Sequence, residues 1–149
     1  MEKMLRHMRA IKNRIEFKKN SLYGSKLTVW NTSHVVSDCK SDVVIGNHCD
    51  IKGTLCSYGG GKIVIGDNLF LGYRSYIGAM DHVTIGNNVI ISSDVRIFDN
   101  NNHPTSPSLR LKMSQSDFYC DLWQWKYSDH KPVVIQDNVW IGEYSAILK

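Results

Sequence analysis

The sequence lacks a long hydrophobic run and a regular cysteine framework, and each absence argues against a class of protein. No apolar stretch approaches the roughly 18 residues needed to cross a bilayer. Basic residues interrupt every apolar stretch near the N-terminus, which argues against a signal peptide. The four cysteines form no Cys-x-x-Cys pair. We therefore expect reduced thiols in a cytoplasmic protein.

The sequence also has little net charge, and that charge is unevenly distributed. It carries 18 Lys and Arg against 14 Asp and Glu, a formal charge of +4. Most of the excess lies in the first twenty residues, so the rest of the chain is close to neutral. This distribution argues against a general nucleic-acid surface. The basic residues of the N-terminal segment are Lys3, Arg6, Arg9, Lys12, Arg14, Lys18 and Lys19.

Residues 1–20 are predicted to form an amphipathic helix, because apolar residues recur there at helical spacing with basic residues between them. We expect the helix to pack on the domain or on a neighbouring subunit. Weak, reversible contact with an acidic membrane surface is the less favoured alternative. The apolar residues are Met4, Leu5, Met8, Ile11 and Ile15.

Beyond residue 20 the dominant pattern has a period of six. Gly often follows the aliphatic residue, and a small or β-branched residue often lies four positions after it. A helix needs apolar spacings of three and four, and a two-faced strand needs strict alternation, so neither explains this pattern. The aliphatic positions are Ile45, Ile51, Ile65, Leu71, Ile77, Ile85, Ile91, Ile97, Ile135, Ile141 and Ile147.

A period of six suits a short strand followed by a sharp corner. Gly and the pairs Asp67-Asn68, Asn87-Asn88 and Asp137-Asn138 tolerate the tight or left-handed backbone that such corners require. Three units make one triangular coil, and stacked coils bury a continuous aliphatic column. We therefore predict an all-β fold: a parallel β-helix over residues 21–149, interrupted by one inserted loop at residues 98–132.

These repeats resemble those of the hexapeptide-repeat acyltransferases. The segment from Val83 onward is similar to the galactoside, maltose and polysialic-acid O-acetyltransferases. The matching stretches are VTIGNNVIISSDVRI, the NNHP of Asn101–Pro104, and the IQDNVWIG of Ile135–Gly142. The resemblance implies a left-handed β-helix, a homotrimer with active sites between adjacent subunits, and acetyl transfer from acetyl-CoA to a hydroxyl of a sugar or cell-surface polysaccharide.

His103 is the predicted catalytic residue, because it matches the family's catalytic histidine. A sugar hydroxyl is a weak nucleophile, and a neutral imidazole can take its proton during attack on the thioester. Asp99 is the first candidate to orient the ring and Asn101 the second. Direct transfer, without an acyl-enzyme, is expected.

The inserted loop is predicted to contact the acceptor. Its aromatic residues, Trp123 among them, suit the faces of sugar rings, although packing on a neighbouring subunit would also explain them. Arg110 follows the NNHP motif in the same loop. Asp81 matches an acidic acceptor-site residue of the family, and Tyr73 and Arg74 lie on the same stretch. The family's acceptor-binding Asn is not evident there, which argues against galactosides as substrates.

The last repeats carry the residues that the resemblance assigns to the CoA arm. Trp140 matches the tryptophan of the family's NVWIG motif, which lines the channel for acceptor and pantetheine near the histidine. Glu143 stands where related enzymes place a residue near that arm.

Two alternatives remain at this point. The sequence ends at Lys149, before the coils that hold CoA in related enzymes, so we also consider a truncated, non-catalytic scaffold that trimerises without binding CoA. A β-helical zinc enzyme of the carbonic-anhydrase type needs three histidines, two of them closely spaced. The six histidines include no such pair, so no metal is expected.

Overall fold

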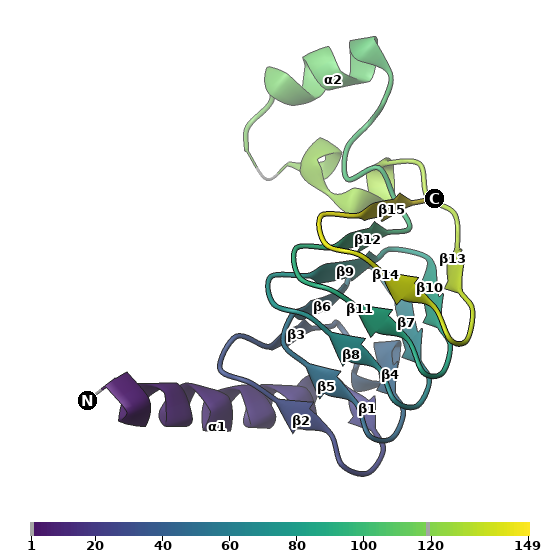
Figure 1. The fold of residues 1–149 in the computed structure, drawn as a ribbon. Helices are drawn as coiled ribbons and strands as arrows, with labels where there is room; N and C mark the ends of the chain where they lie inside the picture. Colours follow the sequence, from purple (N-terminus) through teal and green to yellow (C-terminus); the bar gives the residue numbers. More distant parts are fainter. Residues whose placement is uncertain (1, 119) are drawn as a thin grey trace.

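The computed structural model describes residues 2–118 and 120–149, and within them the chain forms a parallel β-solenoid with a helix at its base (Figure 1). Short strands divide into three five-stranded parallel sheets, and each turn gives one strand to each sheet. The predicted parallel β-helix is therefore confirmed. We name the sheets A, B and C in the order in which the chain enters them, and the corners A–B, B–C and C–A.

The strands are short, as the six-residue period requires. Sheet A consists of β1 (Leu22–Tyr23), β4 (Val43–Ile45), β7 (Lys62–Ile65), β10 (His82–Ile85) and β13 (Val133–Ile135). Sheet B consists of β2 (Thr28–Val29), β5 (Asp50–Ile51), β8 (Phe70–Leu71), β11 (Ile90–Ile91) and β14 (Trp140–Ile141). Sheet C consists of β3 (His34–Val36), β6 (Thr54–Ser57), β9 (Tyr76–Ala79), β12 (Arg96–Phe98) and β15 (Ala146–Leu148).

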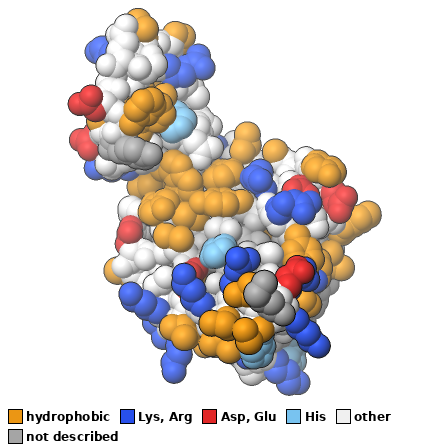
Figure 2. Space-filling view, turned by 90° about the vertical axis from the view of Figure 1, so that its left-hand side faces the viewer, with side chains coloured by type: hydrophobic (Ala, Val, Ile, Leu, Met, Phe, Trp, Pro, Cys, Tyr) orange, Lys and Arg blue, Asp and Glu red, His pale blue; other side chains and the backbone are white. Residues whose placement is uncertain are grey.

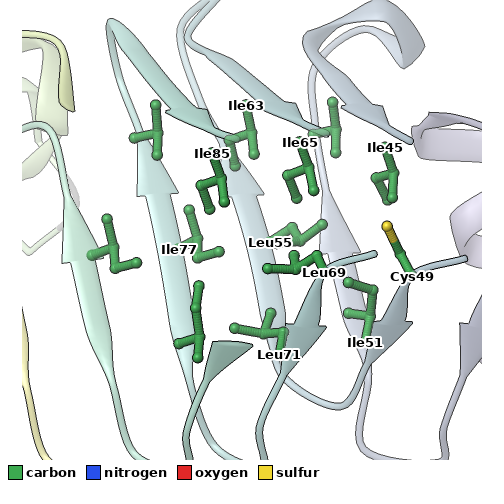
Figure 3. Close-up of a cluster of buried hydrophobic side chains, with 14 of the residues drawn as sticks. Ile45, Cys49, Ile51, Leu55, Ile63, Ile65, Leu69, Leu71, Ile77 and Ile85 are labelled. Carbon is green, nitrogen blue, oxygen red and sulfur yellow. The ribbon is translucent and has the colours of Figure 1, made fainter. Parts of the chain in front are cut away.

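The core is the column of aliphatic side chains inside the solenoid (Figure 3). Equivalent positions of successive turns are in register, so that Leu55 pairs with Ile77 and Ile77 with Ile97. All three side chains are inaccessible to solvent. Fully burying a side chain of this size contributes about 1.5–3 kcal/mol relative to leaving it exposed. The hexad pattern thus identified the core, with Ile147 in the last turn only partly buried.

The corners depend on residues that tolerate a left-handed backbone. Asn68, Asn88 and Asn138 have φ near +60° at the A–B corner, as their Asp-Asn and Asn-Asn pairs predicted. The residue before each of them supports the turn below. Asp67 Oδ1, for example, accepts a hydrogen bond from the backbone N–H of Asn47 at 2.7 Å. This carboxylate–amide ladder continues through Asn87 and Asp137.

The solenoid begins earlier than the regular hexads. β1, β2 and β3 form a first turn that pairs with the second turn in all three sheets. Leu22 pairs with Val44 and Thr28 with Asp50, a spacing of 22 residues, whereas Val43 pairs with Ile63 at 20. In sheet C, however, His34 pairs with Thr54 at 20 residues, so the offset between the first two turns is not constant and the regular period is lost there. The 3₁₀ helix η1 (Lys40–Asp42) leads into the second turn.

The predicted N-terminal helix is α1 (Glu2–Asn20). It packs on the solenoid through Asn13 and Phe17, which are buried, and not through the predicted apolar stripe. Asn13 Nδ2 donates to the carbonyl oxygen of Trp30 at 3.0 Å. Among the described residues, no helix is long and apolar enough to cross a membrane. The apolar residues of the stripe stay exposed, at 46–65% of their surface: Met4, Leu5, Met8, Ile11 and Ile15.

The insertion is more structured than the predicted loop. It contains the helix α2 (Pro107–Ser114) and the 3₁₀ helices η2 (Asp121–Trp123) and η3 (Trp125–Tyr127). It also begins one residue later than predicted, because Phe98 is the last residue of β12 and pairs with Gly78. The lobe that contains α2 projects from the C–A corner of the solenoid (Figure 1).

Candidate functional site

The insertion folds back onto the outer face of sheet C. Trp125 meets Phe98 edge to face, with ring centroids 5.7 Å apart and an interplanar angle of 88°. It also meets Tyr58, from the turn between β6 and β7, at 5.3 Å. Figure 2 shows hydrophobic side chains gathered on the body of the molecule directly beneath the projecting lobe. Sheet C and the insertion thus share an aromatic contact at the C–A corner.

A pocket of about 580 Å³ lies beside this contact. Tyr58, Trp123 and Trp125 supply aromatic rings, and Asp38, Gln124 and Lys126 supply polar groups. Gly59 and Met80 complete the lining. Pockets of this size with apolar walls and a few polar groups are typical of small-ligand sites, and aromatic faces beside hydrogen-bonding groups suit a sugar.

His103 lies next to this pocket. Its ring meets Trp123 edge to face at 5.6 Å, and Trp123 also lines the pocket. The Nδ1 atom of His103 and the Nε1 atom of Trp123 are both buried, and within the described residues neither has a hydrogen-bond partner. A buried polar atom without a partner is costly and needs an explanation.

Asp99 is fully buried and supports the corner on which His103 lies. Its carboxylate accepts hydrogen bonds from the backbone N–H groups of Met80, at 2.9 and 3.0 Å, and of Asp81, at 2.7 Å. It also accepts one from Asn100 Nδ2 at 2.9 Å. Within the described residues its carboxylate forms no hydrogen bond with His103. In the single chain, Asp99 therefore fixes the backbone of the C–A corner.

Asn101 is joined to His103 through the backbone, because the N–H of His103 donates to the carbonyl of Asn101 at 2.6 Å. The N–H of Asn101 donates in turn to the carbonyl of Asp129 at 3.1 Å, which ties the two ends of the insertion together. Arg110 lies on α2 and is exposed. It belongs to the projecting lobe, whereas Asn101 and Asp81 belong to the C–A corner.

The remaining predicted residues lie at a different corner. Tyr73 and Arg74 lie between β8 and β9, at the B–C corner, where Arg74 Nε donates to Asp94 Oδ1 at 2.8 Å. Glu143 lies at this corner one turn beyond Asp94, and Trp140 in β14 is 74% exposed on sheet B. The structure thus divides the predicted residues into a group around His103 at C–A and a group around Trp140 at B–C.

Sheet C carries a buried thiol and a half-buried phenol close to the aromatic contact. Burial is the main cause that raises the pKa of the Cys56 thiol above its usual value, and burial also raises the pKa of the Tyr76 phenol. Tyr76 stacks on Phe98 at 5.4 Å. Both groups therefore stay neutral near pH 7, and a thiol in this state is a poor nucleophile.

The described residues contain no group of three or more His, Cys, Asp or Glu side chains arranged to hold a metal ion.

Three comparisons, with protein families, with curated proteins and with solved structures, found no match to this chain. The interpretation of the site therefore depends on its geometry and on the resemblance of its motifs.

Several residues of the site were not predicted. Asp38, Tyr58 and Met80 line the pocket but lie in turns whose sequences gave no functional signal. They meet the insertion only because each follows a strand of sheet C in successive turns. The triplet Gly59–Gly61, which interrupts the regular hexads beside Tyr58, was the one available indication that this corner is unusual.

Proposed function

We propose that the chain is the subunit of an O-acetyltransferase that moves an acetyl group from acetyl-CoA to a hydroxyl of a sugar or polysaccharide. The single observation that carries the proposal is the position of His103 beside an aromatic pocket. Its ring meets Trp123 edge to face, and its buried Nδ1 has no hydrogen-bond partner among residues 2–118 and 120–149. The solenoid and the resemblance of its motifs support the proposed reaction class, and the aromatic pocket supports a sugar as the acceptor.

In the proposed reaction, His103 takes the proton of the acceptor hydroxyl as its oxygen attacks the thioester carbonyl carbon. The new C–O ester bond forms and the C–S bond breaks. The proton held by His103 then passes to the CoA thiolate, which leaves as the thiol. No acyl-enzyme is needed, in keeping with the raised pKa and full burial of Cys56.

The division of predicted residues between two corners supports a site completed by a second subunit. His103 and Trp140 lie on different corners of one solenoid, so one chain does not bring them together. In a cyclic trimer, the same pair of surfaces meets at each of three interfaces. The C–A corner of one chain would then face the Trp140 side of the next. The resemblance implies this assembly and a left-handed coil.

Acetyl-CoA is the proposed acyl donor. The residue types at the B–C side suit the chemical groups of this molecule. Trp140 offers a broad apolar face to a pantetheine arm. Arg74 adds a cation at the B–C corner, where Asp94 holds it. Glu143 lies at the same corner. The donor supplies the activated acetyl group, and the His103 side supplies the acceptor and its proton transfer.

An acetyl-transfer assay over a panel of mono- and oligosaccharides tests the proposal, with released CoA thiol as the readout. His103→Ala should lower kcat by a factor of about 10²–10⁴, the usual range for loss of a general base. His130→Ala is the matched control, because His130 lies exposed in the same insertion.

Retention of comparable kcat in His103→Ala would contradict the mechanism. Calorimetry with acetyl-CoA distinguishes the enzyme from the alternative, a non-catalytic scaffold. If the chain trimerises but binds no acetyl-CoA, it is a scaffold and the proposal is wrong.

A further inference from the structure

The helix α1 carries an apolar surface that the solenoid does not cover. At about 100° per residue, Asn13 and Phe17 lie on one side of the helix, and Met8 and Ile15 lie on the opposite side. Burial agrees, since Phe17 is 1% exposed, whereas Met8 is 57% and Ile15 is 65% exposed. The sequence thus places five large apolar side chains along the free side of a helix that is already anchored.

This apolar surface continues into a groove at the base of the solenoid. Ile11 and Ile15 form one wall of a groove of about 540 Å³, and Tyr23, Leu27 and Val29 form the other. Tyr23 is itself exposed. Arg14, Lys18 and Lys26 also line this groove, so apolar side chains of the helix and of the first turn lie there among basic ones.

Basic side chains border the stripe on both sides. The helical angles place Lys12 and Lys19 along one edge and Arg14 and Lys18 along the other. Figure 2 looks at α1 from its N-terminal end, where basic side chains gather around the lower part of the molecule. Long basic side chains at the edges of an apolar face can bury their stems and keep their charges in a polar headgroup layer.

The two acidic residues of the helix are engaged within the chain. Glu2 forms an ion pair with Arg6, and Glu16 accepts a hydrogen bond from the backbone N–H of Val35 at 2.8 Å. Glu16 is a helical neighbour of Lys12 and Lys19, but its carboxylate is directed to the backbone of β3. A second α1 placed against this stripe would bring two sets of like charges together, which disfavours a copy of the chain as its occupant.

We propose that α1 and the adjoining groove form a docking surface for an anionic lipid membrane, with the apolar stripe in the interface and the bordering Lys and Arg at the headgroups. An amphipathic helix binds such a surface through its buried apolar area and its attraction to anionic lipid. Each basic residue near the surface strengthens binding by about fivefold. The solenoid is thereby held at the membrane, independently of its activity.

Vesicle co-sedimentation of the full chain, without CoA or sugar, tests this docking. The chain should pellet with phosphatidylcholine vesicles that contain a third of phosphatidylserine, and binding to pure phosphatidylcholine should be at least about tenfold weaker. High salt should release it. Met8→Asp should lower binding at least about tenfold. Leu111→Asp on α2 is the matched control, because Leu111 is also 57% exposed, and it should bind like the wild type.

A second variant tests the charges without placing an acid in the helix. Lys12→Gln with Lys19→Gln should weaken binding to the anionic vesicles by about 25-fold. The proposal is overturned if the wild type does not bind anionic vesicles. It is also overturned if both α1 variants bind as tightly as the wild type. A change of oligomeric mass in Met8→Asp without lipid also overturns it, because the stripe would then be an interface between copies. None of these outcomes depends on whether the chain transfers acetyl groups.

Discussion

Gly78 lies directly beneath Trp125. A Cβ built on Gly78 would come within 2.9 Å of Trp125 Cη2 and 2.6 Å of two atoms of the Phe98 ring. Sheet C therefore accepts the insertion at a point where the strand has no side chain. Phe98 is the cross-strand partner of Gly78 and forms the adjacent part of the same contact.

Substitution of Gly78 should separate the insertion from the solenoid. In Gly78→Val the side chain cannot be accommodated without moving Trp125 or Phe98, and overpacking of this kind costs about 1–3 kcal/mol. We expect a lower free energy of unfolding in urea and a red-shifted tryptophan emission. Gly142→Ala is the control, because a Cβ there meets no atom within 4 Å. An unchanged emission spectrum in Gly78→Val would show that Trp125 does not depend on this contact.

Removal of the Asp99 carboxylate should destabilise the C–A corner. Asp99→Ala leaves the N–H groups of Met80 and Asp81 without their acceptor, and a buried unsatisfied group costs about 1–3 kcal/mol. We expect the free energy of unfolding to fall by at least about 2 kcal/mol. Asp81→Ala removes a neighbouring carboxylate that accepts none of these bonds and should have a smaller effect. Equal losses in the two variants would contradict this role.

The ladder at the A–B corner should respond to acid. The backbone N–H of Asn47 holds the pKa of Asp67 below its ordinary value of 3.8, with help from the Asn47 side chain. Because the folded-state pKa is lowered, the contribution of Asp67 to stability is present above pH 3.8 and is lost as the pH falls through the folded value. Asp67→Asn should keep the accepting oxygen, as Asn87 does in the next turn.

Thermal unfolding from pH 7 to pH 2 measures this effect. The melting temperature of Asp67→Asn relative to wild type should rise as the pH falls below about 4. Asp117→Asn, in the exposed part of the insertion, serves as the control. A difference between Asp67→Asn and wild type that stays constant with pH would mean that the carboxylate charge does not matter at this corner.

Mixing two inactive variants should restore activity, a prediction that depends on the proposed function. His103→Ala and Trp140→Ala remove groups at different corners of one chain. In trimers assembled from equal amounts of both variants, about a quarter of the interfaces would combine an intact His103 with an intact Trp140. Unfolding and refolding the variants together should therefore recover about a quarter of wild-type activity. No recovery of activity would contradict a site shared between two subunits.

The fold was predictable because its determinants are local and repeated. Ile65, Leu71 and Ile77 each specify one short strand, and Asn68, Asn88 and Asn138 specify the left-handed turns of the A–B corner. The first turn was harder to recognise, since it pairs with the second turn at a spacing of 22 residues in sheets A and B but 20 in sheet C. The side of α1 that packs on the solenoid was not predictable. The sequence shows an apolar stripe on the helix, but it does not show what that stripe contacts.

The site was only partly predictable for the same physical reason. His103 could be found because it lies within a short contiguous motif, and its contact with Trp123 joins two predicted residues. The pocket depends on contacts between the insertion and three separate turns of the solenoid, so Asp38, Tyr58 and Met80 have no local signature. The burial of Asp99 could not be inferred either, because its partners lie 18 and 19 residues away.

The register across the insertion has a practical consequence. Val83 pairs with Val133, Ile90 with Trp140 and Arg96 with Ala146, so the same 50-residue offset holds in all three sheets. The stacked turns continue in phase, as if the additional residues were absent. The insertion is therefore a separate segment attached at one corner, and its length does not affect the register of the stacked turns. If the proposed function holds, a different insertion grafted between Phe98 and Val133 should change the acceptor while the stacked turns keep their register.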